Sequence, residues 1–262
     1  MDIVVCIKQV PDTTEVKIDP KTNTLVRQGV PSIVNPFDKN AIEAGLRLKE
    51  KYGGRVTVVS MGPPQANDAL KECLAMGADA AVLVSDRAFG GADTLATSYT
   101  LAAAIRTLGH FDVILCGKQA IDGDTAQVGP EMAEHLGVAQ LTYVAKIEIQ
   151  GDTVEAYREH EEGYEVVEAK LPVLMSVVKS INVPRYPTVK GIMKAVHQDK
   201  IRVLSAKDMD VDMERLGLKG SATQVRQIFT PPQRGQGILI RQDSARKSVD
   251  ELMAKLTDAK IV

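Results

Sequence analysis

Four apolar runs, each followed by a loop and a helical pattern, constrain the fold of this chain most strongly. They cover residues 2–8, 55–61, 80–84 and 111–116. Uninterrupted apolar runs of this length are typical of strands buried on both faces of a parallel sheet. Because parallel neighbours need a crossover helix between them, the alternation predicts an α/β fold with a doubly wound, mainly parallel, Rossmann-like sheet.

The edge at which these strands end is the expected binding edge. Right-handed crossovers place every strand-to-helix loop there, and ligands of such sheets bind where the strand order reverses. We expect four segments to meet at this edge, residues 6–11, 35–38, 60–63 and 117–129, with residues 88–97 beside them.

Residues 113–129 contain a strand, a polar loop and a helical pattern that begins at Thr125. Such a loop offers free N–H groups at a helix N-terminus, where phosphates bind. It matches neither G-x-G-x-x-G nor the P-loop, so nucleotide binding, catalysis and a purely structural loop remain open. Asp122 and Asp124 could form an acid–base pair or bind a metal, although such carboxylates usually serve turns and caps. Their repulsion of a pyrophosphate favours backbone N–H groups and Thr125 as phosphate contacts.

The second candidate segment is residues 89–97. Its Gly-Gly pair at 90–91 lets the backbone approach a ligand closely. Asp93 suits a helix N-cap, as Asn35 does earlier in the chain. Thr94 and Thr97 lie on one face of the following helix, either as ligand contacts or bonded back to their own helix.

After residue 140 the pattern changes. Alternating runs predict an antiparallel extension of the same sheet over about residues 141–178. Two prolines exclude a regular helix at residues 182–187, and a short helix is expected to follow.

We divide the chain into a nucleotide-binding α/β domain, residues 1–204, and a C-terminal arm, residues 205–262. The arm includes an extended stretch at 230–235 and an amphipathic helix at about 247–258. The apolar face of that helix could cover a partner chain or pack on its own domain.

Composition excludes several classes of function. A net charge of −2, 4% aromatic residues and no tryptophan argue against nucleic-acid binding. No window reaches the roughly 18 apolar residues of a membrane span, and no signal peptide is recognisable. Cys6, Cys73 and Cys116 lack metal-ligand spacing, so we expect a cytoplasmic protein without a metal site.

No catalytic side chain is evident either. The four histidines fall outside the expected ligand loops, and no Ser-His-Asp or Cys-His arrangement is available. A bound cofactor would therefore have to carry any redox chemistry.

Short motifs in order along nearly the whole chain match one family pattern. They are residues 5–10, 34–37, 47–49, 75–79, 117–122, 156–159, 161–163, 170–172, 184–186, 191–194 and 231–234. Together they resemble the β subunit of electron transfer flavoproteins. The resemblance implies a heterodimer with an α subunit that holds FAD, an adenine-nucleotide pocket in the β subunit, and an arm that grips the partner.

The resemblance also implies site residues. The nucleotide pocket falls on Cys6, Asn35, Phe37, Asp38, Met61, Gly117, Lys118, Gln119, Ala120, Asp122, Gly123, Asp124, Thr125, Gln127, Val128 and Gly129. The segment that docks on acyl-CoA dehydrogenases falls on residues 184–194, with contacts at Pro184, Tyr186, Val189, Ile192 and Met193. Val189 stands where the family usually has leucine, and Glu159 matches a glutamate of the subunit interface.

Residues 86–97 are absent from members that hold only AMP, and they resemble the subgroup whose β subunit binds a second FAD. Its further contacts would be Phe89, Gly91, Ala92, Asp93, Thr94 and Thr97. In that subgroup NADH is implied to reduce the β flavin. One electron then passes to the α flavin and an acyl-CoA dehydrogenase, and the other passes to ferredoxin or flavodoxin. Structural AMP in the same pocket is the alternative.

Two other classes of protein are alternatives. An ATP-using adenylyl-transfer enzyme would need a Ser/Gly-rich loop after the first strand, and residues 8–12 have none. A nucleotide-sensing module fits the α/β domain but leaves the arm and residues 184–194 without a role.

Overall fold

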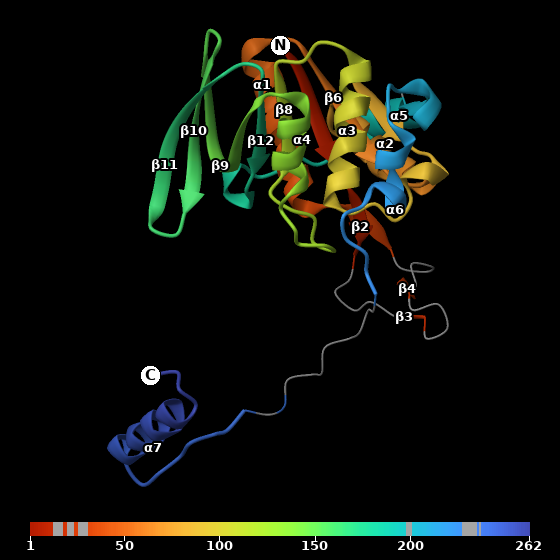
Figure 1. Cartoon of the computed structure of the whole chain (residues 1–262). Coiled ribbons are helices and arrows are strands. Elements are labelled where there is room, and N and C mark those ends of the chain that lie inside the picture. The colour runs from red at the N-terminus through yellow and green to blue at the C-terminus, as the bar shows by residue number, and fades with distance from the viewer. Residues whose placement is uncertain (13–17, 20–23, 26–30, 198–200, 227–234, 236) are drawn as a thin grey trace. The chain divides into compact units, whose positions relative to one another are not determined.

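The computed structural model describes residues 1–12, 18–19, 24–25, 31–197, 201–226, 235 and 237–262. The chain forms two compact units, Met1–Gln227 and Ile228–Val262 (Figure 1). Each unit is considered by itself.

A large sheet forms the centre of the first unit. Within the described residues it has nine strands in the order β11-β10-β9-β12-β8-β1-β6-β7-β13. Neighbours pair in parallel except that β10 is antiparallel to β9 and β11, which confirms the predicted doubly wound, mainly parallel sheet. The strands are β1 (Asp2–Ile7), β6 (Arg55–Met61), β7 (Ala80–Val84), β8 (Val113–Gly117), β9 (Ala139–Gln150), β10 (Thr153–His160), β11 (Gly163–Lys170), β12 (Val173–Val177) and β13 (Ile201–Leu204).

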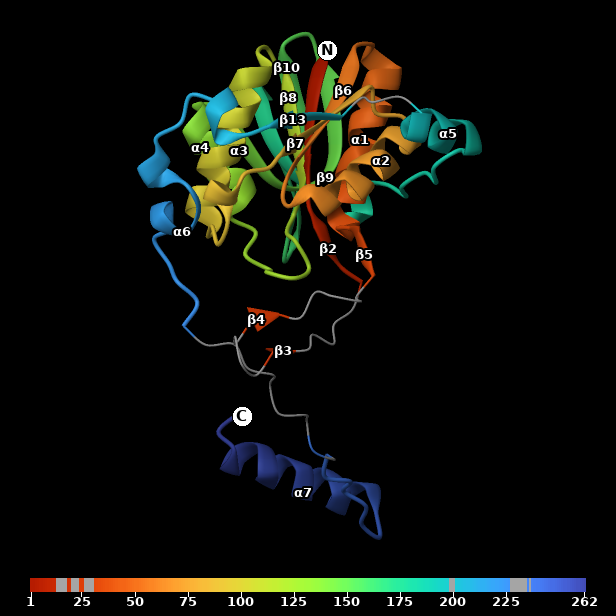
Figure 2. The same ribbon diagram turned by 90° about the vertical axis from the view of Figure 1, so that its right-hand side faces the viewer.

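Helices cover both faces of the sheet (Figure 2). Ile3 and Val5 of β1 belong to one core cluster with α1 and α2, whereas Val4 and Cys6 belong to a second cluster with α3 and α4. This alternation follows from the two-residue period of a strand, and it explains why the run is apolar throughout. The helices are α1 (Pro36–Tyr52), α2 (Asn67–Met76), α3 (Thr94–Leu108) and α4 (Val128–Leu136).

Short elements complete the unit. β2 (Gln9–Pro11) pairs antiparallel with β5 (Ser32–Val34) and so returns the chain from the end of β1 to the start of α1. The other short elements are β3 (Ile18–Asp19), β4 (Thr24–Leu25), η1 (Pro64–Ala66), η2 (Arg87–Phe89), η3 (Lys179–Ile181), α5 (Val189–His197), η4 (Ala206–Asp208), η5 (Met213–Arg215) and α6 (Gly217–Gly220).

The predicted antiparallel extension needs one correction. The antiparallel part comprises β9, β10 and β11, but β12 lies between β9 and β8 and is parallel to both. All five residues of β12 are buried. A continuous apolar run marks a central strand, so residues 173–177 belong to the parallel body of the sheet.

The described chain after residue 204 also continues the first unit. β13 pairs with β7, and Ala206, Met209 and Leu216 are buried in the cluster with α3 and α4. The first compact unit therefore runs to Gln227 and extends beyond the predicted division at residue 204.

The second unit contains α7 (Ala245–Asp258), whose N-cap Ser244 accepts a hydrogen bond from the backbone N–H of Lys247. Val249, Leu252 and Met253 lie exposed on it. Apart from Gly235, the expected extended stretch at 230–235 lies outside the described residues. Among described residues, no helix is long and apolar enough to cross a bilayer.

Candidate functional site

The switch point of the sheet lies between β1 and β8. From β1 the chain moves through β6 to β7 on one side, and then crosses to β8 on the other side. β1 and β8 run in parallel with Cys6 beside Cys116, so the loops that follow them leave the sheet together. The start of α1 joins the same place.

Asp38 ties these segments together. It lies in the first turn of α1 and is only 6% exposed. Its Oδ2 accepts the Lys8 N–H at 2.7 Å, and its Oδ1 accepts the Gly117 N–H at 3.0 Å. Burial raises the pKa of Asp38 to about 7, although these two N–H donors favour the charged form. One carboxyl group thus holds the ends of both strands.

Asn35 shapes the loop after β8. Its Nδ2 donates to the Gln119 carbonyl at 2.8 Å, and its Oδ1 accepts the Ile121 N–H at 3.2 Å. Asn35 is the N-cap residue of α1, as predicted, but its side chain makes no capping hydrogen bond because the amide is used across the site. A fully buried amide that satisfies a loop backbone on both sides holds that loop rigidly.

Asp122 and Asp124, the carboxylates considered as an acid–base pair, both bind other side chains of the protein. Asp122 forms an ion pair with Lys8 Nζ at 2.7 Å, and Asp124 accepts from Gln119 Nε2 at 2.7 Å. This geometry joins the loops after β1 and β8, and it places neither carboxylate as the partner of the other. The structural interpretation of the pair is therefore favoured over an acid–base pair.

The helix after this loop begins three residues later than predicted. α4 starts at Val128, and Thr125 and Gln127 are exposed in the loop before it. Asp124 and Ala126 have φ angles of 49° and 55°, which a helix cannot contain. Thr125 therefore offers its hydroxyl from a loop, not from a helical turn.

Two glycines, Gly117 and Gly129, allow close packing of helices against β8 at the switch point. A Cβ on Gly117 would lie 2.6 Å from Phe37 Cβ and closer still to Asp38, and a Cβ on Gly129 would lie 2.9 Å from Cys116 Sγ. Only glycine allows α1 and α4 to approach β8 this closely. Phe37 is also covered by Lys179, whose Nζ lies 4.9 Å from the ring centre.

Residues 86–97 form a second tightly held segment beside the first. Asp93 caps α3 as predicted, accepting the Ala96 N–H at 3.1 Å. Its other oxygen accepts the Thr223 N–H at 2.9 Å, and its own N–H donates to Ser221 Oγ at 2.8 Å. Phe89 is 5% exposed and packs in the core, and its backbone N–H donates to the Asp86 carbonyl at 3.2 Å.

Glu131 is a residue that the sequence interpretation missed. Thr94 Oγ1 at the start of α3 donates to Glu131 Oε1 in the first turn of α4, at 3.0 Å. Glu131 Oε2 is buried and has no hydrogen-bond partner among the described residues. A buried carboxylate oxygen without a donor is costly, so Glu131 Oε2 is a candidate acceptor for a hydroxyl or N–H group. In the sequence, only its place as the acidic residue near the start of a helical pattern pointed to Glu131.

The remaining nucleotide candidates lie around these two segments. Met61 ends β6 and is partly buried, and Lys118 Nζ lies 4.8 Å from the ring centre of Tyr143. Gly91 has a φ angle of 72°, and Ala92 and Thr97 are partly buried near the start of α3. Ala120 and Gly123 lie in the loop after β8, where the Gly123 N–H donates to the Ala120 carbonyl.

The docking candidates form a separate surface. Tyr186, Val189, Ile192 and Met193 are exposed by 90%, 77%, 48% and 58%, whereas Pro184 is partly buried. Glu159 lies on β10 and accepts a hydrogen bond from Ser180 Oγ. The described residues contain no group of three or more His, Cys, Asp or Glu side chains arranged to hold a metal.

The fold and the switch-point geometry define a Rossmann-like α/β protein. The electron transfer flavoprotein domain family matches residues 22–209. The chain is 60% identical to an electron transfer flavoprotein subunit beta of Clostridium acetobutylicum, over 92% of each chain. It is 52% identical to that of Thermoanaerobacterium thermosaccharolyticum, over 100% of each. It is also 51% identical to the caffeyl-CoA reductase-Etf complex subunit CarD of Acetobacterium woodii, over 100% of each. This chain belongs to the electron transfer flavoprotein family as a β subunit, which implies an α-subunit partner.

Proposed function

We propose that this β subunit binds FAD at the switch point and acts in flavin-based electron bifurcation. NADH delivers electrons to this site. One electron then passes to the FAD of the α subunit and on to an acyl-CoA dehydrogenase, and the other passes to ferredoxin or flavodoxin. The relative that belongs to a caffeyl-CoA reductase complex supports a partner acting on an acyl-CoA thioester.

The observation that carries this proposal is the partnerless oxygen of Glu131 beside Thr94. An adenylate needs contacts for its base, ribose and phosphate, whereas FAD also has the hydroxyls of its ribityl chain. A carboxylate would repel a phosphate, but it accepts hydrogen bonds from hydroxyls. Glu131 and Thr94 therefore fit the hydroxyls of a ribityl chain or a ribose better than a phosphate.

The other residues would bind and orient the adenylate end. The loop after β8, which Asn35 and Lys8 hold, would contact a phosphate through the Thr125 hydroxyl and through N–H groups other than those of Ile121, Gly123 and Asp124, which bond within the protein. Bound FAD would supply the one- and two-electron chemistry. The protein would place and orient this group. Cys6 and Cys116 are buried at the switch point, and burial raises the pKa of both thiols, so neither is suited to act as a nucleophile.

Structural AMP in this pocket is the alternative, and it would use the same adenylate contacts. The β subunit co-purified with its α subunit should contain two flavins per heterodimer, measured by absorbance and by chromatography of the released nucleotides. One flavin and one AMP would contradict the bifurcation proposal but leave the family unaffected.

An adenylyl-transfer enzyme is a weaker candidate. The chain after β1 forms the short strand β2 instead of a phosphate-binding loop. ATP turnover by the isolated chain would favour this class. A nucleotide-sensing module would be favoured if the chain failed to associate with an α subunit in a pull-down.

A further inference from the structure

We propose that Arg185 is a positioning residue for partner docking: with Glu43 and Glu50 of α1 it forms a clamp that fixes the direction in which α5 presents its apolar face. This inference rests on the proposed docking of residues 184–194 on a dehydrogenase. It adds the group that holds that surface in place.

The surface itself is one stripe of a short helix. Val189, Ile192, Met193 and Val196 lie on one face of α5 and are exposed by 77%, 48%, 58% and 66%. The opposite side of α5 packs on α2, where Ala195 is buried. Gly191 lies so close to the carbonyl of Ala75 that a Cβ there would collide with it.

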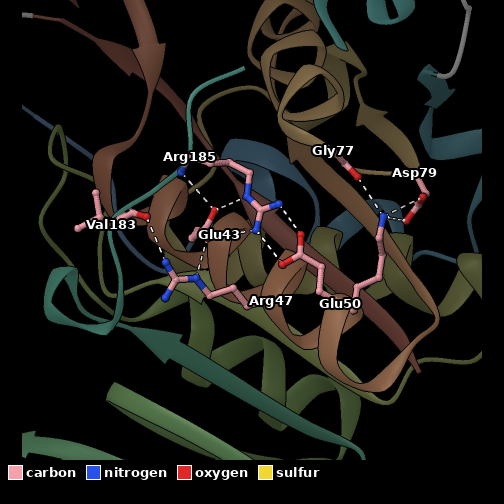
Figure 3. A network of polar contacts seen from close by, with 8 residues as sticks. Glu43, Arg47, Glu50, Gly77, Asp79, Val183 and Arg185 are labelled. Carbon is pink, nitrogen blue, oxygen red and sulfur yellow. Dashed lines mark hydrogen bonds and ion pairs between the residues drawn. The ribbon is translucent and has the colours of Figure 1, made fainter. Parts of the chain in front are cut away.

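The clamp lies just before this helix (Figure 3). Arg185 Nε donates to Glu43 Oε2 at 2.7 Å, and its two terminal nitrogens reach Glu50 Oε1 at 2.5 Å and Glu50 Oε2 at 3.1 Å. The Arg185 backbone N–H also donates to Glu43 Oε2, at 3.2 Å. Side chain and backbone of one residue are therefore both fixed on α1.

Glu43 makes the clamp hard to release. Its side chain is 4% exposed, and although burial opposes ionisation, hydrogen bonds from Arg185 and Arg47 lower its pKa. A buried carboxylate that loses one of these cations is left poorly compensated. Lysine cannot replace the planar fork that bridges two carboxylates.

Further contacts between α1 and the segment before α5 lie next to the clamp. Asn40 Nδ2 donates to the Asn182 carbonyl at 2.8 Å, and Asn182 Nδ2 donates back to the Asn40 carbonyl at 2.9 Å. Asn40, Glu43, Arg47 and Glu50 follow at helical spacing and so share one face of α1. This face holds residues 182–185 along their length.

The clamp is close enough to the docking helix to set its direction. Three residues, Tyr186, Pro187 and Thr188, separate Arg185 from the first residue of α5. Pro187 has a restricted φ angle, and Thr188 Oγ1 accepts the Gly191 N–H at 3.0 Å in the first turn. A connection this short and stiff transmits the placement of Arg185 to Val189.

The test compares Arg185→Lys with Arg55→Lys in the purified heterodimer. Arg55 pairs with Asp2 at 2.7 Å in an exposed contact outside the nucleotide and docking candidates, so it is a matched control. With an acyl-CoA dehydrogenase as titrated acceptor, Arg185→Lys should raise the KM for the dehydrogenase about tenfold, or ~1.4 kcal/mol. The kcat at saturation and the nucleotide content should not change. Arg55→Lys should behave as the parent.

A double-mutant cycle separates positioning from general stability. Val189→Ala should raise the same KM, and adding Arg185→Lys should raise it by less than the product of the two single effects, because both act through one surface. Hydrogen exchange at residues 189–196 should increase in Arg185→Lys only. Fully multiplicative effects, or unchanged exchange, would contradict the clamp.

Val189→Asp separates the two proposals. If this variant leaves dehydrogenase binding intact, the docking surface is wrong and the clamp proposal falls with it. If Val189→Asp abolishes binding while Arg185→Lys matches Arg55→Lys, docking stands and only the clamp is wrong.

Discussion

At the scale of residues, the proposal of a flavin in this site rests on a single pair of side chains, Thr94 and Glu131. We expect Thr94→Ala with Thr97→Ala to weaken β-flavin binding roughly thirtyfold, because two hydroxyl hydrogen bonds of about 1 kcal/mol each contribute about 2 kcal/mol together. Glu131→Ala should have a similar effect. Quantifying flavin in the purified heterodimer tests this, with the α-subunit flavin as internal reference.

Glu134→Ala is the control for this prediction, since Glu134 lies exposed on the same helix. Its flavin content should equal that of the parent. If the threonine variant and Glu131→Ala also keep two flavins, those side chains are not ligands.

Asp38 is a single residue that should make the free energy of unfolding depend on pH. Burial raises its pKa from an ordinary 3.8 to about 7, so between these values the folded state holds a proton that the unfolded state has lost. The stabilisation from Asp38 is complete below the lower value and disappears as the pH rises through the upper one. The free energy of unfolding should therefore decline by at most about 1.4 kcal/mol per pH unit in this window.

Urea unfolding at several pH values, compared with Asp38→Asn in the same assembly, measures this slope. The variant should be less stable overall, because an amide cannot accept both backbone N–H groups. It should also lack the decline. Parallel pH profiles in the two proteins would show that Asp38 does not titrate there.

At the scale of elements, the contact of α1 with β8 depends on the absence of a side chain at residue 117. Gly117→Ala would force Phe37 and Asp38 away, and we expect a loss of about 1–3 kcal/mol of stability. Gly123→Ala is matched, because no atom lies within 4 Å of a Cβ at Gly123. Denaturation midpoints compare the two variants. Equal midpoints would contradict the close packing at the switch point.

Helices and strands were predicted correctly where the sequence of the segment itself shows how it is buried. The runs at β1, β6, β7 and β8 were recognisable because strands buried on both faces are apolar throughout. β12 was assigned to the wrong part of the sheet, because its place between β8 and β9 depends on pairing with residues distant in sequence. The start of α4 was misplaced because positive φ angles at Asp124 and Ala126 are not visible in the sequence.

At the scale of the whole molecule, the boundary between units is the main testable feature. A chain of residues 1–227 should keep the sheet, whereas residues 1–204 would lose the buried Met209 and Leu216 and the contacts of Thr223 with Asp93. Loss of the buried Leu216 side chain alone would lower the free energy of unfolding by about 1.5–3 kcal/mol. Thermal unfolding of both truncations measures the difference, and equal melting temperatures would restore a boundary at residue 204.

The sequence by itself determined the fold class, the family and the segments that gather at the binding edge, because periodicity, turn chemistry and local motifs are written along the chain. Only the tertiary structure decided how side chains at that edge are used. It pairs Asp122 with Lys8, Asp93 with Thr223, and Thr94 with a glutamate that no local pattern singles out. It also brings Arg185 to Glu43 and Glu50. Such contacts join residues far apart in sequence, so they exist only once the sheet has set the distance between them.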